Sequence, residues 1–114
     1  MSKLDDCMVK YMAENKKHNL GIDETFLRAV AKGCGPSIYK ADSSKVSATD
    51  PKELATVRKN FLIKKLGLKD TPKLDEGIAA VMEKFGKGNR NKYRPLVYAL
   101  LATHFRKKSF YKAK

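Results

Sequence analysis

Apolar side chains recur three, four and seven residues apart along most of this chain, and that spacing places them on one face of an α-helix. No stretch of four or more residues alternates between apolar and polar side chains, as a half-buried strand would. The pattern predicts an all-α fold. Because 114 residues is the length of one domain, we expect a single irregular bundle of about five helices plus a short helical turn. This bundle covers residues 1–105, and a basic tail covers residues 106–114.

Capping residues, prolines and glycines set the predicted helix boundaries. Asp23 is a good N-cap, and proline is favoured directly after a cap, as in Asp50–Pro51 and Thr71–Pro72. The predicted helices cover residues 3–18, 24–32, 51–66 and 72–85, and a fifth helix begins between residues 91 and 94 and ends near 105. The fifth is apolar on nearly all sides, which predicts that it is the core helix.

The connection over residues 36–49 is long for a compact domain. It contains Ile38 and Tyr39, which predict a short helical turn, and then a polar loop that Val46 anchors. Its length makes it a second candidate for a functional segment.

The positive charge is concentrated at the carboxyl end. The formal net charge is +13, and no acidic residue follows Glu83. A local excess of this kind predicts a polyanionic partner, either nucleic acid or anionic lipid.

Residues 86–95, "GKGNRNKYRP", combine glycine, asparagine and cations immediately before the core helix. One interpretation is a phosphate site at the amide-rich helix start, with Tyr93 as a stacking or hydroxyl contact. The other is a tight polar turn without a ligand. The cations of the first interpretation are Lys87, Arg90, Lys92 and Arg94.

The tail "RKKSFYKAK" interleaves cations with two aromatic residues, which suits single-stranded nucleic acid or an anionic membrane surface. The alternative is a solvated terminus whose aromatic side chains fold back on the core. Its candidate binding residues are Arg106, Lys107, Lys108 and Lys112. A joint surface requires that these cations and those of residues 86–95 converge in space, although the core helix separates them.

No residue pattern indicates catalysis or metal binding. Cys34 lies between two glycines and could be an activated thiol, but it needs a histidine partner. His18 fits the charge preference of a helix end, and His104 is expected on the inward face of the last helix. The histidines and cysteines lack zinc spacing. A helix-turn-helix over residues 62–81 is disfavoured because Asp75 and Glu76 would face the phosphates. We therefore expect no enzyme, cofactor or metal.

The amino end places Asp5 and Asp6 where a signal peptide needs apolar residues. The apolar run over residues 96–105 is far shorter than the roughly 20 residues that span a bilayer. These features predict a cytoplasmic protein without a transmembrane segment, with Cys7 and Cys34 as free thiols.

Three stretches, "KGCGPSIYKADSSKVS", "VRKNFLIKKLGLKD" and "GNRNKYRPLVYALL", together resemble a family of short bacterial proteins, domain of unknown function 2853. The resemblance covers about residues 3–105. It implies a compact, helical, bacterial cytoplasmic protein, and it brings no established activity, cofactor or catalytic residue.

The sequence thus favours weak, largely sequence-independent binding of RNA or DNA through the basic carboxyl-terminal region. The alternative is a protein-interaction module with no nucleic-acid role, which would use an apolar groove lined by Tyr39 and the 36–49 loop.

Overall fold

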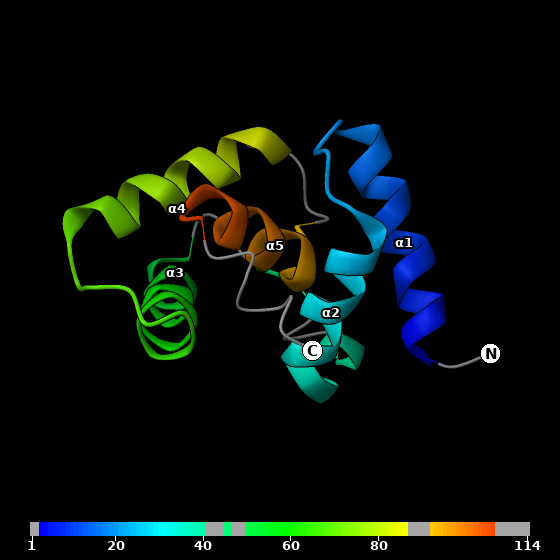
Figure 1. The fold of residues 1–114 in the computed structure, drawn as a ribbon, viewed down its shortest axis with the longest axis horizontal. Coiled ribbons are helices and arrows are strands. Elements are labelled where there is room, and N and C mark those ends of the chain that lie inside the picture. The colour runs from blue at the N-terminus through cyan, green and yellow to red at the C-terminus, as the bar shows by residue number, and fades with distance from the viewer. Residues whose placement is uncertain (1–2, 41–44, 47–49, 87–91, 107–114) are drawn as a thin grey trace.

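The computed structural model describes residues 3–40, 45–46, 50–86 and 92–106. These residues form an irregular helical bundle around one central helix (Figure 1). The predicted all-α fold is confirmed, with five α-helices, one 3₁₀ helix and one π-helix. They are α1 (Lys3–Lys17), α2 (Glu24–Cys34), η1 (Gly35–Tyr39), α3 (Pro51–Thr56), η2 (Val57–Lys65), α4 (Pro72–Phe85) and α5 (Arg94–His104). No described helix is both long enough and apolar enough to cross a membrane.

Helix α5 is the core helix, as its apolarity on all sides predicted. Eight of its 11 residues are buried. It lies against both α2 and α4, and Figure 1 shows it, in orange, between these two elements. Pro95 is in its first turn, where the missing amide hydrogen leaves no intrahelical bond unmade.

A buried asparagine holds the turn between α1 and α2. The Asn15 side chain donates to the Ile22 carbonyl at 2.7 Å and accepts from the Ile22 amide at 3.1 Å. Gly21 has a φ of 71°, which allows the chain to reverse here. Asp23 then caps α2 by accepting from the Phe26 amide at 3.1 Å, as predicted.

The third predicted helix has the expected extent but changes geometry along its length. It begins at Pro51 as α3 and continues from Val57 as the π-helix η2. The Leu66 amide donates to the Phe61 carbonyl, five residues back, at 2.9 Å. A turn this wide explains why the apolar residues of this segment cover a broad arc.

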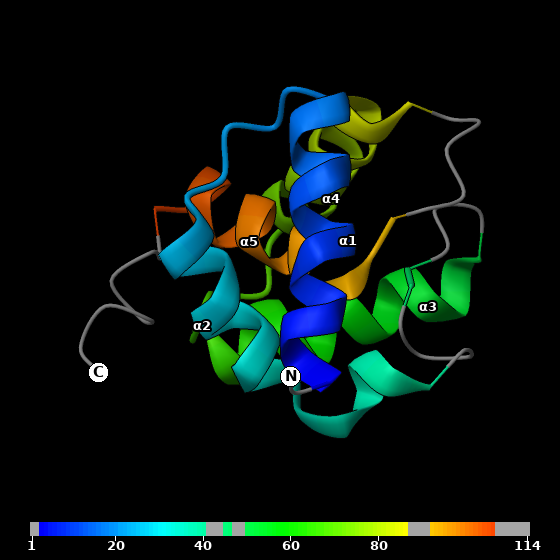
Figure 2. The same ribbon diagram turned by 90° about the vertical axis from the view of Figure 1, so that its right-hand side faces the viewer.

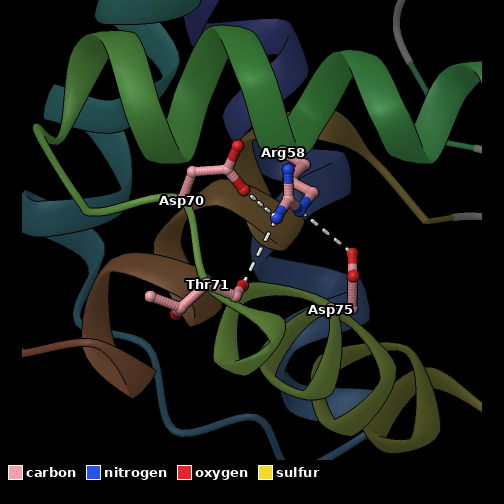
Figure 3. Close-up of polar contacts among 4 residues, drawn as sticks. All are labelled: Arg58, Asp70, Thr71 and Asp75. Carbon is pink, nitrogen blue, oxygen red and sulfur yellow. Dashed lines mark hydrogen bonds and ion pairs between the residues drawn. The ribbon is translucent and has the colours of Figure 1, made fainter.

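Arg58 stabilises the connection between η2 and α4 through polar contacts (Figure 3). Its guanidinium pairs with Asp70 and, at 3.2 Å, with Asp75, and it also donates to the Thr71 carbonyl at 3.4 Å. Asp75 therefore serves an ion pair within the fold. This use of the carboxylate agrees with the argument against a helix-turn-helix.

Residues 45–46 pair with the chain that leads into α5. The Val46 amide donates to the Lys92 carbonyl at 2.8 Å, and Lys45 and Tyr93 form an isolated antiparallel bridge. Val46 is buried, so it anchors the 36–49 connection as predicted.

Helices α4 and α5 approach closely at Gly77, where an added Cβ would lie 2.7 Å from Phe105 Cε2 and 3.0 Å from His104 Cδ2. We expect Gly77→Ala to lower the free energy of unfolding by about 1 kcal/mol, because overpacking, typically 1–3 kcal/mol, outweighs alanine's helix propensity, roughly 1 kcal/mol. Urea denaturation measures this change. The matched control adds Phe105→Ala, which removes the clash, so that Gly77→Ala should then stabilise. An increase in stability from Gly77→Ala alone would contradict the close packing.

Candidate nucleic-acid interface

Arg94, a predicted binding residue at the start of α5, lies in a buried polar cluster. Its Nη2 is 2.5 Å from Glu53 Oε1, and its Nη1 donates to the Tyr98 hydroxyl at 2.9 Å. Burial alone would lower the pKa of Arg94, but Tyr98 and then Glu53 outweigh this effect and raise it. Arg94 is therefore a charged residue that a carboxylate of α3 neutralises, rather than a mobile cation at the surface.

Lys92 and Tyr93 are also held inside the fold. Lys92 is only 4% exposed, and this burial lowers its pKa. The half-buried Tyr93 ring lies 5.2 Å from the Tyr11 ring, and the Lys45 amine is 5.5 Å from the Tyr93 ring centroid. We expected mobile cations around the start of α5, but the Lys92 and Arg94 side chains are both buried there. Both side chains turn inward because the core helix begins there.

Arg106 is exposed and follows the other end of α5, with a left-handed φ of 59°. Since α5 has 11 residues and rises about 1.5 Å per residue, its two ends are separated by roughly 16 Å. In the described residues the two predicted clusters thus begin at opposite ends of a buried helix, and their convergence in space stays a prediction. The other predicted binding residues, Lys87, Arg90, Lys107, Lys108 and Lys112, lie outside the described residues.

Arginine and lysine have different roles in the described part of the chain. Three arginines hold carboxylates: Arg28 pairs with Asp5 at 2.8 Å, Arg58 with Asp70 and Asp75, and Arg94 with Glu53. Many exposed lysines make no ion pair with any described carboxylate. These are Lys3, Lys10, Lys16, Lys17, Lys32, Lys40, Lys45, Lys52, Lys59, Lys64, Lys69, Lys73 and Lys84.

The surplus of positive charge is not confined to the carboxyl-terminal region. Of the 25 cations and 12 carboxylates of the chain, 19 cations and 11 carboxylates lie in the described residues, a difference of +8. Three arginines are paired with four of the 11 described carboxylates, and the exposed lysines are paired with none, so lysine ammonium groups in contact with water carry most of the surplus.

Comparison with known families matches residues 10–109 to the model of the "Protein of unknown function (DUF2853)" family. The chain belongs to the DUF2853 family. The resemblance noted in the sequence is thus confirmed. A comparison with curated proteins finds no match.

The partial burial of Cys34 acts against the cysteine chemistry considered for this DUF2853 protein. Burial raises the pKa of the Cys34 thiol to about 11, although Lys65 and Arg94 act in the opposite direction. A nucleophilic cysteine needs the reverse shift, because the thiolate is the reactive form. The described residues of this family member also contain no group of three or more histidine, cysteine or carboxylate side chains that could hold a metal ion.

The two histidines of the DUF2853 chain are placed differently from each other. His18 comes directly after the last residue of α1, one position beyond the helix end and not inside the last turn as predicted, and its Nε2 is 3.3 Å from Glu14 Oε1. His104 is exposed and packs edge-on against Phe105 at 4.9 Å, so its predicted inward orientation is wrong. The helix turns His104 outward, while Leu100 and Leu101 face the core.

Sequence reasoning also missed the structural role of Arg94 in this DUF2853 chain. Tyr98 follows Arg94 by four residues, and on a helix that spacing brings two side chains together. This signal was available in the sequence. The partner Glu53 is 41 positions away, so no local pattern could have identified it.

Proposed function

We propose that this protein is a non-enzymatic, cytoplasmic binder of RNA or DNA, with weak affinity and little sequence preference. The observation that carries the proposal is the excess of cations over carboxylates: no acidic residue follows Glu83, and the exposed lysines of the described part lack a described carboxylate partner. Phosphate backbones attract such cations because binding releases condensed counterions, whatever the base sequence.

The proposal keeps the carboxyl-terminal cations as its main contacts and changes the role of two residues. Arg106 is exposed, and Lys107, Lys108 and Lys112 follow it in the sequence. Lys87 and Arg90 stay in the proposal as sequence-based candidates. Arg94 and Lys92 are buried, so in this proposal they support the fold rather than contact phosphates.

Salt dependence provides the test. With about five phosphates neutralised, the slope of log affinity against log salt should be roughly −3.5 for single strands and −4.5 for duplex DNA. Fluorescence anisotropy of labelled oligonucleotides, titrated between low and physiological salt, measures this slope. Absence of binding to every oligonucleotide at low salt would end the proposal.

Charge-matched variants locate the contacts. Lys107→Gln, Lys108→Gln, Lys112→Gln and Lys114→Gln together remove four charges from the tail. The control removes four exposed lysines of the folded part by Lys59→Gln, Lys69→Gln, Lys73→Gln and Lys84→Gln. We expect the tail variant to flatten the salt slope by about 0.7 to 0.9 for each phosphate that it no longer neutralises, and to do so more than the control. Equal effects of the two variants would show that net charge, rather than the tail, governs binding.

The alternative protein-interaction module receives less support from the described surface. An apolar docking face usually shows as an exposed patch of several hundred square ångströms. In the described ranges, only Val9 and Tyr39 are exposed large apolar side chains. Affinity purification from cell extract, with and without nuclease, separates the two functions. A partner protein that remains bound after nuclease treatment would favour the alternative.

A further inference from the structure

Tyr39 stands out at the surface. It is 45% exposed, and it is the single aromatic residue among the large exposed apolar side chains of the described ranges. It ends η1, directly after the buried Ile38. The buried neighbour fixes the backbone to which the exposed ring is attached.

One lysine lies near the Tyr39 ring in space, and another follows Tyr39 in the chain. The Lys3 amine is 5.9 Å from its centroid, and the exposed Lys40 follows it in the chain. Figure 2 shows η1 below the amino-terminal end of α1, the end that carries Lys3. Asp5, two positions after Lys3, is occupied by Arg28 at 2.8 Å. The exposed Asp6, three positions after Lys3 and therefore beside it on α1, makes no ion pair with a described residue and offsets one of these charges. Lys3 and Lys40 together still leave a positive charge near the ring, which suits an anionic ligand.

Tyr93 is less accessible than Tyr39. Tyr93, which we expected to offer the stacking contact, is half-buried between Tyr11 and the Lys45 amine. Lys45 itself is exposed, and it lies on the segment that pairs with residues 92–93. Tyr39 can thus take the stacking role that the sequence suggested for Tyr93.

We propose that Tyr39 is a stacking platform for a base of single-stranded nucleic acid, with Lys3, Lys40 and Lys45 as contacts for the neighbouring phosphates. This inference rests on the proposed nucleic-acid binding and narrows its substrate class to single strands. Bases in a duplex already stack on one another, so only an unpaired base can lie on an exposed protein ring. The Lys3 amine is close to the outer limit of roughly 6 Å for a cation–π contact, and it can turn from the ring to a phosphate when a base arrives.

Affinity measurements on Tyr39 variants test the platform. Tyr39→Ala should weaken binding of a 12-nucleotide single strand about 5- to 150-fold, the range for removal of one stacked base. Binding of a duplex with the same sequence should change less than twofold. The salt slope should stay as in the wild type, because stacking releases no counterions. Tyr39→Phe should retain wild-type affinity, and Val9→Ala is the control at the other large exposed apolar side chain of the described ranges.

A spectroscopic variant gives a direct readout. The chain contains no tryptophan, so Tyr39→Trp introduces a single reporter at the platform. Its emission should be quenched by the single strand and unaffected by the duplex, while Val9→Trp should respond to neither.

The outcomes separate the two proposals. If the wild type binds no oligonucleotide, both proposals fail. If the wild type binds a single strand but Tyr39→Ala binds it equally well, the platform is overturned and the electrostatic function stands. If Tyr39→Phe loses as much affinity as Tyr39→Ala, the hydroxyl makes the contact, and base stacking is overturned.

Discussion

Replacing Phe61 by alanine should lower the free energy of unfolding by about 3–5 kcal/mol, the usual cost of removing a fully buried phenylalanine ring. Phe61 is 1% exposed and lies in the π-helix η2. Its ring stacks on that of Tyr98, with the centroids 3.9 Å apart and an interplanar angle of 11°. The substitution would leave a cavity beside the Tyr98–Arg94 contact, at the junction of η2 and the core helix. Urea denaturation followed by circular dichroism measures the destabilisation.

Two variants of the same π-helix serve as controls for Phe61. Asn60→Ala changes the exposed neighbour and should alter stability by less than about 0.5 kcal/mol. Phe61→Leu keeps an apolar side chain in the space and should cost less than Phe61→Ala, because the remaining cavity is smaller. If Phe61→Ala stayed within about 1 kcal/mol of the wild type, the ring would not be packed as the structure shows.

Local chemistry explains why most helix boundaries were predictable. The Asp23 cap, the Asp50–Pro51 start and the position of Pro72 act through backbone groups within a few residues. Gly67 and Gly86 end their helices with φ angles of 72° and 83°, which other residues rarely adopt. Such signals depend little on the rest of the fold, so the sequence contains them in full. Helix α2 runs past the predicted end to Cys34 because Gly33 is tolerated inside it, and the chain leaves the helix at Gly35.

Tertiary contacts explain what the sequence did not predict. The wide apolar arc of residues 57–66 fits an α-helix with two buried sides as well as a π-helix. In the structure the π-helix places Phe61 against Tyr98 of α5, a contact between distant segments that no local pattern contains.

The environment of charged residues also depends on distant segments and could not be predicted from local sequence. Neighbouring cations in "GKGNRNKYRP" suggested an exposed site, yet Arg94 is buried because Glu53 of α3 lies opposite it. The roles of Lys87 and Arg90 stay predictions, as do those of the cations after Arg106.

The Arg94–Glu53 pair offers a test that separates fold from binding. We expect Arg94→Met to lower the free energy of unfolding by about 3 kcal/mol, because the Glu53 carboxylate is left without its partner in a largely buried position. The Glu53 side chain is 25% exposed and the Arg94 side chain 10%, so the effect should lie at the lower end of the range for buried pairs. Arg94→Lys should also destabilise, since one ammonium cannot reproduce the two planar contacts to Glu53 and Tyr98.

A double variant and a binding measurement complete this test of Arg94. Adding Glu53→Leu to Arg94→Met removes the stranded carboxylate, and we expect it to restore part of the stability. Below the unfolding transition, Arg94→Met should bind oligonucleotides with the salt slope of the wild type, because a guanidinium already paired inside the protein displaces no counterions. A normally stable Arg94→Met whose salt slope is flatter by about 0.7 to 0.9 would reverse the assignment and make Arg94 a phosphate contact, as the sequence pattern first suggested.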